Sequence, residues 1–179
     1  MRSRLNLIAA AVTAALVGAL AGASASAQEA RPACAQMDAD LPPELAAWSQ
    51  RTDVVSAAAA ADLAKAELTP GRAVTAALHP TREVAYLAQP EKPGGSVAHG
   101  GLFRLRIGAA GTYRVVLGSG AWIDLLKDGQ PVVSSAHAPG PACSTARKTV
   151  EFPLERGDYV LQVSANADPK LAILVIPRP

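Results

Sequence analysis

The sequence lacks an excess of basic charge, and this argues against one class of partner. It contains 17 lysine and arginine residues and 15 aspartate and glutamate residues, a formal net charge of +2 at pH 7. Two of the basic residues, Arg2 and Arg4, lie in a segment that we expect to be removed, which leaves 15 residues of each sign. Proteins that bind nucleic acid present a basic surface to the phosphates. We therefore predict no nucleic-acid partner.

Histidine is also scarce, and the motifs of common enzyme classes are missing. The three histidines, His79, His99 and His137, are far apart and show no metal-ligand spacing. Ser119 is flanked by single glycines and lacks the G-x-S-x-G spacing of a nucleophile elbow. Neither a phosphate-binding loop nor a dinucleotide fingerprint occurs. From these patterns we predict no cofactor.

A long apolar run is present only at the start of the chain. Arg2 and Arg4 precede an uncharged segment, residues 5–20, and the small residues 23–27 follow it. This order is typical of a cleaved signal peptide. An uncleaved membrane anchor is the alternative, but the run is short and ends in small residues rather than in a charged flank. We predict a signal peptide over residues 1–27, a mature chain that starts at Gln28, and a periplasmic or secreted location without a transmembrane segment.

Cysteine is limited to two residues, Cys34 and Cys143, and both lie beyond the predicted signal peptide. In an oxidising compartment such a pair usually forms a disulfide. A thiolate metal ligand or nucleophile, assisted by nearby His137, is the alternative. The predicted bridge would tie the N-terminal arm to the back half of the domain, and we expect its role to be structural.

The composition of the remaining chain changes near residue 69. Residues 28–68 are rich in alanine and proline, and we predict an N-terminal arm with short helices at 43–50 and within 54–68. In residues 69–179, short apolar runs alternate with glycine and proline, which predicts one β domain. The predicted strands lie at residues 73–78, 83–88, 103–107, 113–117, 122–125, 132–135, 148–154, 159–165 and 171–176.

Two loops and one tight turn separate these strands. Residues 89–95 and 137–144 are rich in proline and glycine and are predicted loops, and Asp128-Gly129 indicates a two-residue hairpin turn. Because no helices lie between the strands, a parallel sheet is disfavoured. The pattern predicts a mainly β fold, an antiparallel, jelly-roll-like β-sandwich with a short N-terminal helical arm.

One repeated sequence pattern predicts which side chains face the core. The order glycine, polar residue, tyrosine occurs at 111–113 and again at 157–159, and apolar residues follow at every second position. We expect Tyr113 and Tyr159 to point inward at the start of their strands. Arg114 and Gln162 are one position out of phase, so we expect both to face water.

The chain resembles two groups of bacterial proteins. Residues 103–126 and 152–163 resemble the Gly-x-Tyr strand pairs of pre-peptidase C-terminal domains, which are small β-sandwiches of exported proteins. The strings PEKPGGSVAHGG, GSGAWID and GPACSTARK are similar to short exported proteins, some of which carry the name homogentisate 1,2-dioxygenase. That enzyme resembles a large cupin with an iron site of two histidines and a glutamate. No H-x-H or H-x-x-x-x-E pair occurs here, so the resemblance implies an exported β-sandwich and adds no iron site.

Three groups of residues are candidates for a binding site. The first is His99 and His137 with Asp124 and Glu91, which would form a metal site if their loops converge at one end of the sandwich. Histidines that bond to the backbone or face solvent are the alternative.

The second candidate is Trp122 with Tyr86, beside the glycine-rich loop at 90–101. An outward-facing tryptophan at such a loop suits the stacking of sugars or peptides. Alternatively, the arm held by Cys34 covers Trp122.

The third candidate is a row of three arginines, Arg104, Arg106 and Arg114. If their two strands form a hairpin, the row shares one face and suits anionic glycans or lipid headgroups. A solvated charged face is the alternative.

We weigh two functions. Predicted export, the sandwich pattern and the missing catalytic motifs favour a non-enzymatic periplasmic module that binds an unknown protein or glycan. The alternative is a small metal-dependent enzyme that uses His99 and His137 as metal ligands.

Overall fold

The computed structural model of the chain describes residues 34–178. The predicted signal peptide and the predicted start at Gln28 lie outside the described residues. The described residues include three short 3-10 helices, η1 (Pro43–Ser49), η2 (Ala60–Lys65) and η3 (Thr81–Glu83). The strands are β1 (Thr52–Val55), β2 (Glu67–Leu68), β3 (Ala73–Ala77), β4 (His79–Pro80), β5 (His99–Ile107), β6 (Gly111–Leu117), β7 (Trp122–Lys127), β8 (Gln130–Val132), β9 (Ala136–Pro139), β10 (Lys148–Leu154), β11 (Gly157–Asn166) and β12 (Lys170–Pro177).

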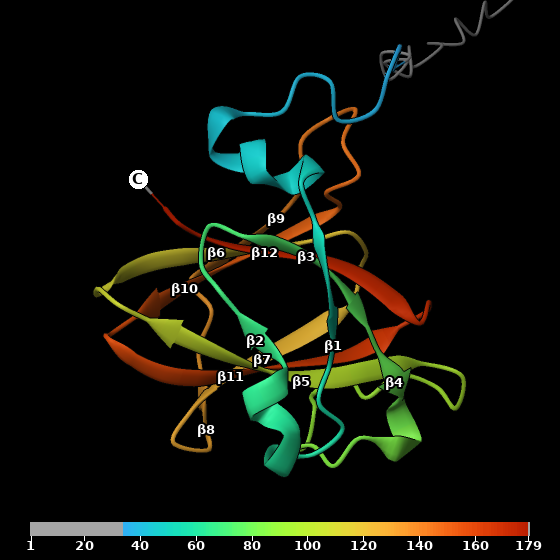
Figure 1. Cartoon of the computed structure of the whole chain (residues 1–179), viewed down its shortest axis with the longest axis vertical. Helices are drawn as coiled ribbons and strands as arrows, with labels where there is room; N and C mark the ends of the chain where they lie inside the picture. The colour runs from blue at the N-terminus through green and yellow to red at the C-terminus, as the bar shows by residue number, and fades with distance from the viewer. Residues whose placement is uncertain (1–33, 179) are drawn as a thin grey trace, which may run out of the picture. The chain divides into compact units, whose positions relative to one another are not determined.

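The strands form two sheets that pack face to face as a β-sandwich, as predicted (Figure 1). Sheet A has the order β1-β3-β12-β6-β10-β9, and sheet B has the order β2-β5-β11-β7-β8, with β4 paired to β5. The prediction of purely antiparallel sheets is wrong in two places. The β1–β3 and β2–β5 pairs are parallel, because each joins a strand from the segment before residue 69 to the edge of a sheet.

Alternation along the strands fills the space between the sheets, as the sequence predicts. Tyr113, Val115 and Leu117 of β6 are buried in one cluster with Leu161 and Val163 of β11. Side chains at every second position share a face of a strand, so these rows form the core between the sheets. The predicted inward phase of both tyrosine strands is confirmed.

Both tyrosines also close the corner that precedes their strand. The Tyr113 hydroxyl donates a hydrogen bond to the Ala109 carbonyl at 3.0 Å. The Tyr159 hydroxyl donates to the Glu155 carbonyl at 2.9 Å and accepts from the Glu155 N–H at 3.0 Å. Each corner carries the chain from one sheet to the other, so the repeated pattern marks two sheet-switching corners.

Four predicted elements differ from the structure. The predicted strand at 132–135 is wrong beyond Val132, where β8 ends, because the chain then crosses to sheet A. The predicted helix within 54–68 is replaced by the end of β1, η2 and β2, because the flanking residues pair with β3 and β5 instead of continuing a helix. The predicted strand at 83–88 is absent, since η3 and irregular backbone occupy this segment. The predicted loop at 137–144 begins inside β9, which pairs with β10.

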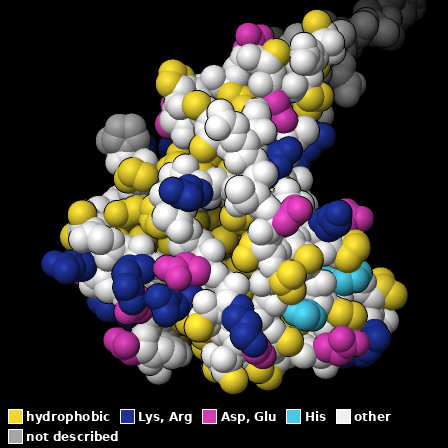
Figure 2. All heavy atoms as spheres, viewed as in Figure 1, with side chains coloured by type: hydrophobic (Ala, Val, Ile, Leu, Met, Phe, Trp, Pro, Cys, Tyr) yellow, Lys and Arg dark blue, Asp and Glu magenta, His cyan; other side chains and the backbone are white. Residues whose placement is uncertain are grey.

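The predicted arginine row does not exist as one surface. β5 and β6 do not pair as a hairpin, because β5 lies in sheet B and β6 lies in sheet A. Arg104 and Arg106 belong to β5 in sheet B. Arg114 belongs to β6 in sheet A, where its guanidinium nitrogen lies 2.9 Å from a carboxylate oxygen of Glu151 in the same sheet. On the face shown in Figure 2, basic and acidic side chains are interspersed.

The expectation that Gln162 and Arg114 face water is wrong, although their strand phase is right. Gln162 points away from the core but is only 1 % exposed. Its amide accepts hydrogen bonds from the N–H groups of Leu87 and Ala88 and donates one to the Ala88 carbonyl. The irregular segment 84–98, which follows η3 and which we call the covering segment, therefore covers the outer face of sheet B here. The Arg114 side chain is 23 % exposed and bonds to Glu151.

The predicted disulfide is present between Cys34 and Cys143. Beside it, Asp38 accepts hydrogen bonds from the backbone N–H and hydroxyl of Thr145 and from the Ser144 hydroxyl. The helix η1 continues this arm across the outer face of sheet A, where Trp48 is fully buried. Strands β1 and β2 precede residue 69, so the sheets begin earlier than the predicted boundary of the β domain.

Candidate functional site

A pocket opens at the edge of the sandwich where one strand changes sheets. The hairpin turn Asp128-Gly129 has positive φ at both positions, 52° and 77°, which matches the predicted tight turn. After it, β8 pairs with β7 only as far as the Leu125–Val132 pair. The chain then crosses to sheet A, where the Ser135 N–H donates to the Glu151 carbonyl and β9 pairs with β10. The gap left beside β7 is the pocket, which we call the edge pocket.

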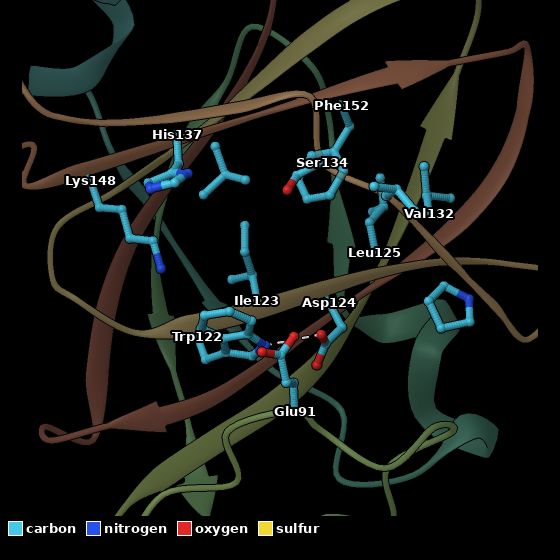
Figure 3. Close-up of a pocket in the computed structure, with 13 residues that line it drawn as sticks. Glu91, Trp122, Ile123, Asp124, Leu125, Val132, Ser134, His137, Lys148 and Phe152 are labelled. Carbon is cyan, nitrogen blue, oxygen red and sulfur yellow. Dashed lines mark hydrogen bonds between the residues drawn. The ribbon is translucent and has the colours of Figure 1, made fainter.

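The floor of the edge pocket is part of the core. Ile123 and Leu125 of β7 and Phe152 of β10 line it (Figure 3), together with Val150 of β10. Its volume is about 340 Å³, which is at the lower end of the range for small-molecule sites. Residues 131–134, which comprise the end of β8 and the start of the crossing to sheet A, form one wall. An apolar group can therefore reach core side chains without any rearrangement of the sheets.

The rim of the edge pocket is polar and contains both charge signs. Trp122 and Asp124 of β7 lie at one side, and the Trp122 indole N–H donates to the Asp124 carboxylate at 3.0 Å (Figure 3). Glu91 reaches the same side from the covering segment. Lys148 and His137 line the opposite side. An apolar floor between an acidic and a basic side is suited to an amphipathic ligand that carries charge.

The Asp124 carboxylate has an unused hydrogen-bonding oxygen. One oxygen accepts from Trp122, while Oδ2 is buried and has no hydrogen-bond partner. Burial raises the pKa of Asp124, and the charge of Glu91 raises it further, while the Trp122 hydrogen bond opposes the shift. A buried carboxylate oxygen without a donor is unfavourable. A cationic or N–H-bearing group at this position would satisfy it.

Lys148 spans the space between the two sheets. Its alternation with Val150 and Phe152 places it on the inner face of β10, and its ammonium donates to the Ala121 carbonyl at 2.8 Å. The ammonium also lies 5.2 Å from the centroid of the Trp122 ring. Burial lowers the pKa of Lys148, and the charge of Lys92 lowers it further.

The covering segment is held in place by β11. Besides the three hydrogen bonds of Gln162, the Ser164 hydroxyl donates to the Lys92 carbonyl at 2.8 Å. The Lys92 ammonium lies 4.5 Å from the Trp122 ring centroid, within the range of a cation–π interaction. The segment that carries Glu91 and Lys92 to the rim is therefore anchored to the sheet by hydrogen bonds. Lys92 and Lys148 contact Trp122. The alternative that the N-terminal arm covers Trp122 gains no support from the described part of the arm, in which η1 packs on sheet A.

The structure brings together some of the predicted site residues and separates others. Trp122, Asp124 and His137 all line the edge pocket. Tyr86 lies outside its lining and donates to the Val163 carbonyl at 3.2 Å. His99 also lies outside it, at the start of β5, and its Nδ1 is buried without a hydrogen-bond partner.

The metal hypothesis gains no support from the side-chain arrangement. Within residues 34–178, no group of three or more histidine, cysteine, aspartate or glutamate side chains is arranged to hold a metal ion. His137 lines the edge pocket, whereas His99 does not. A metal-dependent enzyme that uses both residues stays a prediction.

Sequence reasoning missed Lys148 as a site residue, although a signal for it was present. Lys148 is in phase with two apolar residues of a half-buried strand, and a lysine in the inward phase of such a strand is unusual. The roles of Lys92 and of the pocket floor had no such signal. They depend on which loop covers β11 and on where β8 leaves β7.

Comparisons with known proteins give structural likenesses but no family. No family model and no curated protein matches the chain. The chain is similar to the crystal structure of the pre-peptidase C-terminal domain of a collagenase from Bacillus anthracis, with 11 % identity over 70 % of this chain and 97 % of that one. The TM-score is 0.37, which is too low to assign the chain to that domain family. These comparisons lend no support to the homogentisate 1,2-dioxygenase name.

A membrane-spanning helix was not predicted beyond the signal peptide. Over residues 34–178, none of the helices has the length and apolar character needed to cross a bilayer.

Proposed function

We propose that this β-sandwich is a non-enzymatic, exported binding module whose ligand occupies the edge pocket. The observation that carries the proposal is the pocket itself, in which an apolar floor open to the core lies between acidic and basic side chains. The Cys34–Cys143 disulfide supports an oxidising, extracytoplasmic location. The unpartnered Asp124 oxygen supports a ligand that carries a hydrogen-bond donor or a positive charge.

The two tryptophans allow a direct test by NMR. The chain contains two tryptophans, and both indole N–H groups are hydrogen-bonded, Trp122 to Asp124 and Trp48 to Thr145. The probe is 6-aminohexanoate, which joins an ammonium and a carboxylate through an apolar chain. We expect a saturable shift of the Trp122 indole resonance during titration, while the Trp48 resonance stays in place as an internal reference.

A pair of variants shows whether the acidic side of the rim takes part. Asp124→Asn keeps the acceptor for Trp122 and removes the charge, so it should weaken binding of the probe. Asp158→Asn removes a carboxylate that is paired with Arg106 on the exposed surface of the same sheet, and it should leave binding unchanged. Equal binding by both variants, or a Trp122 resonance that never moves, contradicts the proposal.

A further inference from the structure

We propose that the ligand of the edge pocket is an extended peptide segment that adds to β7 as an antiparallel strand beside Trp122, Ile123 and Asp124. This inference rests on the proposed binding function and names the ligand class. It is carried by the unpaired edge of β7, by the pocket floor and by the charges on the rim.

The backbone N–H and C=O of Ile123 point toward the edge of β7 along which β8 does not extend. The turn at 128–129 makes Lys127–Gln130 a hydrogen-bonded pair of the hairpin, and Leu125–Val132 is the next pair of that kind. By the same alternation, the N–H and C=O of Ile123 point toward this edge. Strand β8 ends at Val132, so among residues 34–178 no strand pairs with Ile123 there.

The pairing direction follows from the strands that already flank β7. Both β8 and β11 run antiparallel to it. A bound peptide would occupy the position that β8 would fill if it continued to pair with β7 beyond Val132. Recognition of peptides by strand addition at a free sheet edge is a general binding mode, in which backbone bonds supply affinity and side-chain pockets supply specificity.

The register determines which peptide side chain enters the pocket. Residues directly opposite each other in a ladder share a face of the sheet. The peptide residue opposite Ile123 therefore points toward the floor formed with Val150 and Phe152. A β-branched apolar residue such as valine suits both this apolar floor and the extended backbone.

The charges on the rim determine the two flanking peptide residues. The residue opposite Asp124 lies beside the buried, unpartnered carboxylate oxygen and beside Glu91, so a lysine is favoured there. The residue opposite Trp122 lies beside the ammonium groups of Lys92 and Lys148, so a glutamate is favoured there. Antiparallel pairing then gives the order lysine, valine, glutamate along the peptide.

Three blocked peptides test this assignment on the oxidised protein. Ac-Lys-Val-Glu-NH2 has the predicted order, and Ac-Glu-Val-Lys-NH2 has the same composition in reverse. The third peptide has the predicted order with an N-methyl group on the valine nitrogen, which removes the donor to the Ile123 carbonyl. The readouts are the Trp122 indole resonance and the hydrogen-exchange protection of the Ile123 amide.

We expect the predicted peptide to shift the Trp122 resonance and to protect the Ile123 amide. Reversal of the order and N-methylation should each weaken binding by about tenfold, which corresponds to the loss of a hydrogen bond or a charge contact. Equal binding of the N-methylated peptide, or of both orders, overturns the inference. Protection of Ile123 without peptide, together with a mass that doubles with concentration, also overturns it, because a second copy would then occupy the edge.

The outcomes separate this inference from the proposed function. If 6-aminohexanoate moves the Trp122 resonance and no peptide does, the peptide assignment fails and the binding function stands. If neither the probe nor any peptide moves it, both fail.

Discussion

At the scale of single residues, polar side chains buried on the outer face of sheet B organise the site. Gln162 and Ser164 of β11 bond to the backbone of the covering segment, and this segment delivers Glu91 and Lys92 to the rim. The shape of the edge pocket therefore depends on side chains that do not line it.

Replacing Gln162 should destabilise the protein more than its polar character suggests. Gln162→Ala leaves the N–H groups of Leu87 and Ala88 and the Ala88 carbonyl without their partner. Each of these partly buried hydrogen bonds contributes about 0.5–1.5 kcal/mol to the free energy of unfolding, and the variant loses all three. Chemical denaturation measures the loss. The control is Gln130→Ala, at an exposed position of β8, which should change stability by less than about 0.5 kcal/mol. Equal effects at both sites would contradict the buried network.

Replacing Asp124 should stabilise the protein at neutral pH. Its folded-state pKa is raised above the ordinary value of 3.8 by burial and by Glu91, so the folded state binds the proton more tightly than the unfolded chain does. The free energy of unfolding therefore falls as pH rises from about 3.8 through the folded pKa. The asparagine of Asp124→Asn does not titrate, so the free energy of unfolding of this variant should exceed that of the wild type at neutral pH. The difference should disappear in acid, where Asp124 of the wild type is protonated.

Asp158 supplies a control of opposite sign for the pH experiment. A hydrogen bond from Arg106 lowers its pKa, so its carboxylate contributes stability above pH 3.8 that is lost as pH falls. Asp158→Asn should not stabilise at neutral pH. Denaturation of both variants across the acid range provides the measurement, and an Asp124→Asn variant that is less stable than the wild type at neutral pH would contradict the prediction.

At the scale of elements, two corners and one early strand ending determine how the sheets are joined. The glycine and tyrosine at the start of β6 and of β11 mark turns that carry the chain between sheets, and each hydroxyl bonds four residues back. The departure of β8 from β7 after Val132 opens the pocket between the sheets. The corners close the sandwich, whereas the crossing strand leaves part of its edge open.

The two tyrosine corners should differ in their sensitivity to loss of the hydroxyl. Tyr159 makes two hydrogen bonds to Glu155, and Tyr113 makes one to Ala109. At about 0.5–1.5 kcal/mol for each bond, Tyr159→Phe should cost more than Tyr113→Phe. Either substitution by alanine should cost about 3–5 kcal/mol, because the ring is buried. Denaturation of the four variants tests this order, and equal costs for both Phe variants would contradict the hydrogen-bond count.

At the scale of the whole molecule, the N-terminal arm is held to sheet A by covalent and packing contacts. The disulfide joins positions separated by 109 residues. Asp38 binds the loop that carries Cys143, and Trp48 fills a cluster on the outer face of sheet A. Arm and sandwich are therefore expected to unfold together.

Removal of the disulfide should lower stability without removing the fold. A Cys34→Ser, Cys143→Ser variant releases a loop of 109 residues, and loops of this size contribute about 2–5 kcal/mol through the unfolded state. The Trp48 indole resonance should persist in the variant, because its cluster does not include the cysteines. Thiol labelling of the denatured, unreduced wild type provides the companion measurement, and two labelled cysteines per chain would contradict the bridge.

Local pattern determined the secondary structure of much of the chain. Alternation predicted the inward rows of β6 and β11, the repeated tyrosines marked equivalent positions, and Asp128-Gly129 predicted its hairpin turn. The two cysteines predicted their own pairing because no others compete for it within the sequence. These features depend on backbone geometry over a few residues or on composition, so they can be read without a fold.

Only the tertiary structure decided which strands pair and what covers the outer faces. Alternation gives the face of a strand but not its partner, so a hairpin of β5 and β6 was compatible with the sequence although the two strands lie in different sheets. Gln162 follows the outward phase and is nevertheless buried, because a segment more than 70 residues earlier packs over it. The edge pocket exists because β8 leaves β7 for the opposite sheet, and long-range packing between the sheets, rather than any local sequence preference, determines where a strand crosses.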